Sequence, residues 1–120
     1  MAVDPFTERL GRVRERFVSA LESKIEDTYA AIPDLSNDKP EAVETVEETY
    51  RRIHSIVGIG PTVGFVSTGR AARSVEHILL QPHRAERGMT GEEIESFRKA
   101  LHALREAATR ELQSFYSGWR

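Results

Sequence analysis

Histidines are the residues of this 120-residue chain best suited to chemistry, because the chain contains no cysteine. No two of them have the i, i+4 spacing that lets two imidazoles on one helix share a metal ion. None follows a glutamate at the Glu-x-x-His spacing of di-iron bundles. We therefore expect neither a metal ion nor a cofactor held by this chain. The histidines are His54, His77, His83 and His102.

His54 differs from the other histidines in the residues that follow it. On a helix, Gly58 lies one turn later on the same face, so no side chain would cover the imidazole on that side. A glycine inside a helix costs up to about 1 kcal/mol relative to alanine, so open space beside an exposed histidine indicates a function. Because neutral imidazole is a nucleophile at neutral pH, His54 is a candidate for covalent group transfer.

Helical periodicity extends over four segments, and no segment alternates with the period of a β-strand. The first helix is expected from about residue 5 to 32, with Asp4 as its N-cap and Pro33 as its stop. The second is expected to begin near Asp38, where Glu41 completes a capping box, and to end in the Gly58–Pro61 run.

The third helix is expected from Pro61 or Thr62 to about Leu80. Gly64 and Gly69 lie inside this segment, where their cost in stability indicates a close approach by a neighbouring helix or a partner. On this reading Gly64 also thins the wall beside the histidine of the second helix.

Residues 81–89, which include His83, are expected to form a loop. The fourth helix then opens on a second capping box, formed by Thr90 and Glu93. In all four helices most of the apolar residues recur at spacings of three or four, so each helix has one apolar face. These residues are Phe6, Leu10, Val13, Phe17, Leu21, Ile25 and Ile32; Val43, Val46, Tyr50, Ile53 and Val57; Val63, Val66, Ala72, Val75, Ile78 and Leu79; and Ile94, Phe97, Leu101, Leu104, Ala108, Leu112, Phe115 and Trp119.

Four amphipathic helices with short connections predict an all-α fold, an antiparallel up-down four-helix bundle that forms one domain over residues 1–120. Residues 1–5 are assigned no function, because they could be a remnant of cloning. At about 100° per residue, His54 lies on the flank of the second helix, neither in the core nor on the far polar face.

The formal net charge of −2 argues against nucleic acid binding, which usually requires a strongly basic surface. No apolar run approaches the roughly 18–20 residues of a membrane span. No cationic segment followed by an apolar stretch marks a signal peptide. We therefore expect a cytoplasmic monomer that binds neither nucleic acid nor membrane.

The segment from His54 to Phe65, HSIVGIGPTVGF, resembles the signature of the histidine phosphotransfer (HPt) domain family. That signature has a histidine, an aliphatic residue at +2, glycine at +4, a small residue at +6, glycine at +10 and an apolar residue at +11. The number of helices and the chain length are also similar to an HPt domain, so the resemblance extends over most of the chain. The matching residues after the histidine are Ile56, Gly58, Gly60, Gly64 and Phe65, with Val75-Glu76 as a downstream pair.

This resemblance implies a phosphorelay, in which His54 takes a phosphoryl group from the aspartyl phosphate of one receiver domain and passes it to another. The partners would be response-regulator receiver domains, a hybrid histidine kinase, or both. The receiver would supply magnesium, so this chain would need no cofactor. Gly58 would give clearance beside the imidazole, and the docking surface would comprise Tyr50, Ile56, Val57, Ile59, Val63, Gly64 and Phe65. Plain core packing is an equally good reading of Ile59, Val63 and Phe65.

Val57 departs from the family pattern, because many members carry a lysine there whose charge can assist the phosphoryl group. Arg51, one turn before His54, is the candidate for this charge support, with Arg70 and Arg73 as alternatives on the third helix.

The missing lysine leaves open a second reading, an HPt-like docking module that binds a receiver or a histidine kinase without being phosphorylated. An unrelated helical adaptor, in which His54 is incidental, is a third. A self-contained hydrolase lacks support, since the sequence has no carboxylate pair, nucleophile elbow or P-loop.

Overall fold

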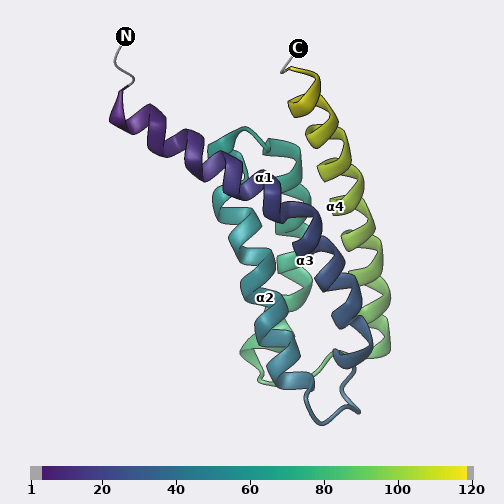
Figure 1. Ribbon diagram of the computed structural model, residues 1–120. Coiled ribbons are helices and arrows are strands. Elements are labelled where there is room, and N and C mark those ends of the chain that lie inside the picture. Colours follow the sequence, from purple (N-terminus) through teal and green to yellow (C-terminus); the bar gives the residue numbers. More distant parts are fainter. Residues whose placement is uncertain (1–3, 119–120) are drawn as a thin grey trace.

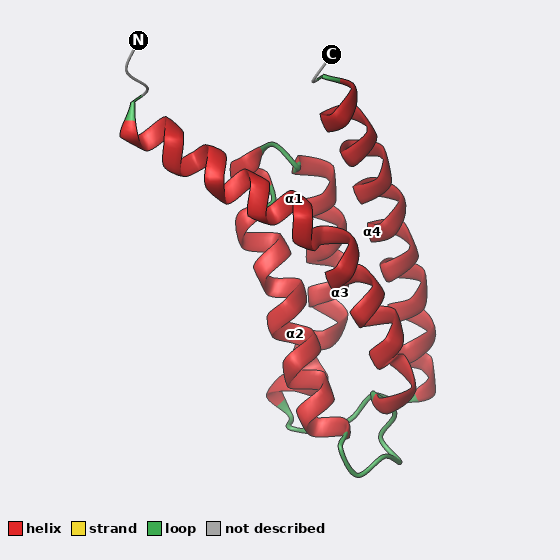
Figure 2. Ribbon diagram, viewed as in Figure 1, coloured by secondary structure: helices red, strands yellow, loops and turns green. Residues whose placement is uncertain are grey.

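The computed structural model describes residues 4–118, and all regular structure in this part of the chain is helical (Figure 1). Figure 2 shows that the loops between the helices are short. The predicted all-α class is therefore confirmed. The elements are α1 (Pro5–Ala31), α2 (Ala42–Ile59), α3 (Val66–Arg84) and α4 (Gly91–Ser117), with 3₁₀ turns at Ile32–Asp34 and Pro61–Val63.

The four α-helices pack as a bundle around one hydrophobic core. The closest packing is of α3 against α2 and α4, and α1 lies against both α2 and α4. The connections at one end of the bundle touch each other, because Asn37 N–H donates to Met89 O (2.9 Å) and Met89 N–H donates to Leu35 O (2.7 Å). Leu35 and Met89 are buried there, so these connections close the core at that end.

Two of the predicted helix starts are confirmed. Asp4 caps α1, accepting a hydrogen bond from Phe6 N–H (3.4 Å), and Pro5 occupies the first helical position. The capping box of α4 has both of its bonds. Glu93 N–H donates to Thr90 Oγ1 (3.2 Å), and Thr90 N–H donates to Glu93 Oε1 (2.9 Å).

The predicted start of α2 at Asp38 is wrong. The helix begins at Ala42, and Glu41 precedes it without a side-chain capping bond. Two successive turns occupy the intervening residues, with Lys39 N–H donating to Ser36 O (2.9 Å) and Ala42 N–H donating to Lys39 O (3.2 Å). These turns satisfy the backbone groups that an earlier helix start would have used.

The predicted start of α3 is also wrong, because Gly64 interrupts the helix. Gly64 has φ 94°, in the left-handed region, and separates the turn Pro61–Val63 from the helix proper, which begins at Val66. Gly69 does lie inside α3. A Cβ at this position would lie 2.7 Å from Pro61 Cγ, so only glycine lets the connection fold over the helix.

At its other end, α3 continues to Arg84 rather than stopping at Leu80, although Pro82 lies inside it. Proline has no N–H to donate, but so near the helix end this removes only one hydrogen bond. His83, expected in a loop, is therefore helical.

The end of α3 is a Schellman motif. Arg87 N–H donates to Pro82 O (3.1 Å), and Glu86 N–H donates to His83 O (3.2 Å). Glu86 has φ 50°, in the left-handed region, where this position of a Schellman motif usually has glycine.

The buried face of α2 is shifted by about one residue from the predicted stripe. Val43 is exposed, and Tyr50 and Val57 are half-buried. Hydrophobicity alone underrates small residues such as Ala42 and Thr49, which let packed helices approach closely. The residues of α2 that are buried are Ala42, Val46, Thr49, Ile53 and Ile56.

The first and last helices, α1 and α4, are longer than α2 and α3, and their free ends project beyond these two helices (Figure 1). Helices α1 and α4 have 27 residues each, whereas α2 and α3 have 18 and 19. The predicted apolar stripe of α1 is buried only from Phe17 onward, and Phe6 and Val13 are 66% and 37% exposed. Trp119, predicted to extend the stripe of α4, lies outside the described residues.

Candidate functional site

His54 lies on the exposed surface of α2, beside α3, and its side chain is 62% exposed. Its Nδ1 is hydrogen-bonded to Oε2 of Glu76, a residue of α3 whose side chain is only 18% exposed. Because an ionised carboxylate can only accept, Nδ1 carries the hydrogen and donates it to Glu76. In the neutral ring the lone pair then lies on Nε2, which has no hydrogen-bond partner among residues 4–118.

Tyr50 lies one helical turn before His54, and its ring is nearly parallel to the imidazole. The two ring centroids are 5.7 Å apart, and the ring planes differ by 11°, which is an offset stacked arrangement. Tyr50, expected to contact a partner, thus contacts the candidate nucleophile itself.

Gly58 lies one turn after His54, on the side opposite Tyr50. A Cβ built at Gly58 would meet nothing within 4 Å, so the space expected beside the imidazole is open. The ring is therefore held at Nδ1 and on one face. Its Nε2 edge and the Gly58 side are left for an incoming group.

Arg51, the candidate for charge support, is engaged elsewhere. Its Nη2 lies 2.6 Å from Glu47 Oε1, one turn back along α2. The Arg51 side chain is 76% exposed, and exposed pairs of this kind contribute about 0–1 kcal/mol, so an approaching anion can compete for the guanidinium. Arg73 is exposed, precedes Glu76 by one turn of α3, and forms no ion pair within residues 4–118.

Three residues expected on the docking surface lie in the core instead. Ile56, Val63 and Phe65 are only 0%, 1% and 3% exposed, so their side chains are not available to a partner. The ring of Phe65 packs against Phe17 of α1, with centroids 5.2 Å apart. Ile56 is buried because α2 is rotated from its predicted orientation. Val63 is buried because the Pro61–Val63 turn folds inward.

The other expected docking residues divide into two groups. Val57 is half-buried and Ile59 is 37% exposed, so both present apolar surface on the last turn of α2. Gly64 is exposed, but it lines a hollow with Arg14 of α1 and Glu111 of α4. A Cβ built at Gly64 would meet only Arg14 Nη2 (3.8 Å) within 4 Å.

Glu76 is the site residue whose role could not be read from the sequence. It appears there only as part of the Val75-Glu76 pair of the family signature. Its 22-residue separation from His54 becomes a contact only when α3 folds back along α2. Its place in that pair was the available signal, and it is a weak one.

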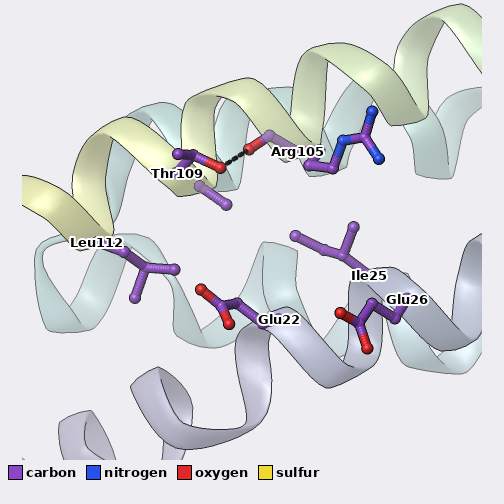
Figure 3. A pocket seen from close by; sticks show the side chains of 7 residues that line it. Glu22, Ile25, Glu26, Arg105, Thr109 and Leu112 are labelled. Carbon is purple, nitrogen blue, oxygen red and sulfur yellow. Dashed lines mark hydrogen bonds between the residues drawn. The ribbon is translucent and has the colours of Figure 1, made fainter.

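The groove between α1 and α4 offers no comparable chemistry (Figure 3). Its volume is about 140 Å³, below the roughly 300 Å³ of a typical small-molecule pocket. The guanidinium of Arg105 lies over the ring of Tyr29 (4.7 Å to the centroid), and Thr109 Oγ1 donates to Arg105 O (2.8 Å). Nowhere in residues 4–118 do three or more His, Cys, Asp or Glu side chains cluster as a metal site.

No family model, curated protein or solved structure matches this chain. Within the described residues, no helix combines the length and the apolar character needed to cross a membrane. Functional inference therefore depends on the chemistry of the His54 site.

Proposed function

We propose that this chain is a histidine phosphotransfer protein, in which His54 accepts a phosphoryl group from the aspartyl phosphate of one receiver domain and donates it to another. The observation that carries the proposal is the exposed imidazole of His54, bonded at Nδ1 to Glu76 and open on the Gly58 side. Nothing else in the described chain combines an exposed nucleophile with a partly buried carboxylate from a second helix.

The transfer step follows from this arrangement. The Nε2 lone pair of His54 attacks phosphorus in line, forming the N–P bond as the bond between phosphorus and the aspartyl oxygen breaks and the aspartate leaves as a carboxylate. The ring gains positive charge, and the carboxylate of Glu76 stabilises this charge through the Nδ1 hydrogen bond. Attack by the aspartate of the second receiver reverses these bond changes and frees the imidazole.

The receiver domain contributes the acidic pocket and its magnesium ion in this proposal. The protein itself needs a positioned imidazole and a docking surface, for which Val57, Gly58 and Ile59 are the exposed candidates. Arg73 or a released Arg51 would screen the charge of the phosphoryl group. The partners are receiver domains, a hybrid histidine kinase, or both, and the protein acts as a cytoplasmic monomer.

The finer architecture belongs to the same proposal. We infer an antiparallel up-down order of the four helices within one domain. In support, the α1–α2 and α3–α4 connections touch through Ser36 and Met89 at one end of the bundle. In such an order the α2–α3 connection lies at the other end, close to Gly58.

A second candidate is a docking module that binds a receiver or a histidine kinase and takes no phosphoryl group. Two observations favour it. Val57 stands where many HPt domains carry a lysine, and Glu47 engages Arg51. This candidate and the phosphotransfer protein would use the same surface, so only the chemistry at His54 separates them.

Transfer from receiver domains tests the proposal. Each receiver domain of the source genome is charged with [³²P]acetyl phosphate and mixed with wild-type protein, His54→Gln or His102→Gln. His102 is a matched control, because its side chain is 57% exposed and its Nε2 lies 2.9 Å from Glu106 Oε1. We expect acid-labile, base-stable label on the wild type and on His102→Gln, and none on His54→Gln.

Each outcome of this experiment has a separate meaning. Equal labelling of His54→Gln would eliminate His54 as the acceptor. A wild-type protein that binds a receiver but takes no label would be the docking module. A protein without affinity for any receiver domain would be an unrelated helical adaptor.

A further inference from the structure

A column of three parallel rings crosses the surface between α2 and α3. Tyr50 lies in its middle. One face of Tyr50 stacks on His83 of α3, with centroids 4.3 Å apart and planes at 8°. Its other neighbour in the column is His54, at 5.7 Å and 11°. The candidate nucleophile is therefore the exposed end of a stack that is anchored on a second helix.

The stack restricts a motion that the Glu76 hydrogen bond leaves free. Rotation of an imidazole about its last side-chain bond is soft and broadly distributed, because it joins a tetrahedral carbon to a planar ring. Glu76 holds one atom in the plane of the His54 ring, whereas Tyr50 blocks tilting out of that plane on one side. Together the two contacts limit the orientations open to the imidazole.

His83 in turn keeps Tyr50 in place. Because the Tyr50 ring also stacks on His83, that ring cannot swing away from His54 without losing the closer of its two stacks. His83 reaches this position only because α3 continues through Pro82 to Arg84 and closes in its Schellman motif. A helix that stopped at Leu80, as expected from the sequence, would leave His83 in a loop.

We infer that Tyr50 and His83 are positioning residues for His54, which hold its imidazole in the orientation that attacks phosphorus. This inference rests on the proposed function. Orientation of the reacting groups contributes a large part of most rate enhancements, and small misplacements slow transfer markedly. The stack supplies part of that orientation from side chains that need not touch the donor.

The test compares variants that keep a ring with variants that lose it. Tyr50→Phe and His83→Phe retain an aromatic ring at each position, whereas Tyr50→Leu and His83→Ala remove it. Two quantities are measured on each protein: the transfer rate from a ³²P-labelled receiver domain, and the NMR shifts of the His54 ring protons. Tyr116→Leu is the matched control, because Tyr116 is an exposed tyrosine of α4 whose ring meets Phe115 edge to face, away from His54.

We expect Tyr50→Leu to slow transfer by about tenfold and to move the His54 ring signals, because the ring current above the imidazole is lost. His83→Ala should give smaller changes of the same sign. Both phenylalanine variants and Tyr116→Leu should behave as the wild type. Slow transfer by the phenylalanine variants would contradict the inference that the aromatic ring alone is required.

A Tyr50→Leu protein that transfers at the wild-type rate would overturn the inference. If Tyr50→Leu does not fold, as judged by circular dichroism, His83→Ala decides by the same criterion. If the wild type takes no label from any receiver, the proposed function fails and the positioning role in transfer fails with it. The ring-proton shifts still report in that case whether the stack exists, so the two failures can be told apart.

Discussion

At Gly58, the open space that the proposed site needs conflicts with the preference of a helix for a residue other than glycine. Gly58 is the last residue but one of α2, where alanine would be the better helix former. A Cβ at this position meets nothing within 4 Å, so packing does not explain the glycine. The proposed function offers a reason for the glycine, which is access to His54 from the side away from Tyr50.

Substitution of Gly58 separates these two requirements. We expect Gly58→Ala to raise the free energy of unfolding by about 0.5–1 kcal/mol, because alanine loses less backbone entropy on folding. Gly58→Leu should instead slow phosphoryl transfer to His54, since its side chain fills the approach. Urea unfolding and ³²P transfer measure the two effects. Normal transfer by Gly58→Leu would show that the donor approaches from elsewhere.

The candidate nucleophile was predictable from the sequence, but its surroundings were only partly so. His54 and Gly58 are separated by one helical turn, and a local spacing of this kind survives folding unchanged. Glu76 contacts His54 and His83 contacts Tyr50 from another helix, so their roles depend on packing that a single sequence does not reveal. The burial of Ile56 likewise follows from the rotation of α2, which small core residues decide.

Among the helices, α3 ends in the conformation that is least favourable for its own residues. Its last turn contains Pro82, and Glu86 adopts a left-handed conformation to close the Schellman motif. A side chain with a Cβ loses about 1 kcal/mol or more in this conformation relative to glycine. The turn is nevertheless the one that carries His83 to Tyr50.

Replacing Glu86 by glycine should therefore stabilise the protein. Part of the gain is offset by the larger entropy of glycine in the unfolded chain, so we expect an increase of about 0.5–1 kcal/mol in the free energy of unfolding. Thermal or urea denaturation provides the measurement. Glu86→Ala is the control, since it removes the charge but keeps the Cβ, and it should leave the stability close to that of the wild type.

The helix boundaries show where local signals are sufficient. Asp4 and the Thr90–Glu93 box act on the adjacent backbone, and both predicted starts are confirmed. The Asp38–Glu41 pattern has the same form, but turns through Lys39 use those backbone groups first. Pro82 signals a helix stop, yet so close to the helix end its cost is small enough for tertiary packing to override.

At the scale of the whole molecule, an ion pair between Arg87 and Glu93 fastens the α3–α4 connection to the start of α4. Arg87 makes two bonds to the Glu93 carboxylate, Nη1 to Oε1 (2.8 Å) and Nη2 to Oε2 (3.0 Å). Thr90 N–H donates to the same carboxylate. The hydrogen bonds from Arg87, more than those from Thr90, lower the pKa of Glu93 from 4.5 to about 2.

Because of this lowered pKa, the free energy of unfolding depends on pH. The folded protein binds the Glu93 proton more weakly than the unfolded chain, so the contribution is complete above about pH 4.5 and is lost as the pH falls towards about 2. We expect Glu93→Gln to lower the free energy of unfolding at pH 7 by about 1 kcal/mol, since solvent screens this partly exposed pair.

Urea unfolding at pH 7 and at pH 2.5 checks this prediction. The difference between Glu93→Gln and the wild type should shrink at the lower pH. Glu92→Gln, one residue earlier and exposed, is the matched control and should change little at either pH. A difference that stays constant across this range would show that the ionised pair is not its source, since glutamine can also complete a capping box.

The projecting ends of α1 and α4 have a consequence for how the protein moves through solution. The molecule measures 58 × 25 × 19 Å, and its radius of gyration is 15.8 Å. A compact domain of this length would have a radius of gyration of about 13.6 Å. Such a rod experiences more friction than a sphere of equal mass, and it tumbles faster about its long axis than end over end. A single copy will therefore elute from a sizing column ahead of compact standards, and its elution volume alone would mimic a larger assembly.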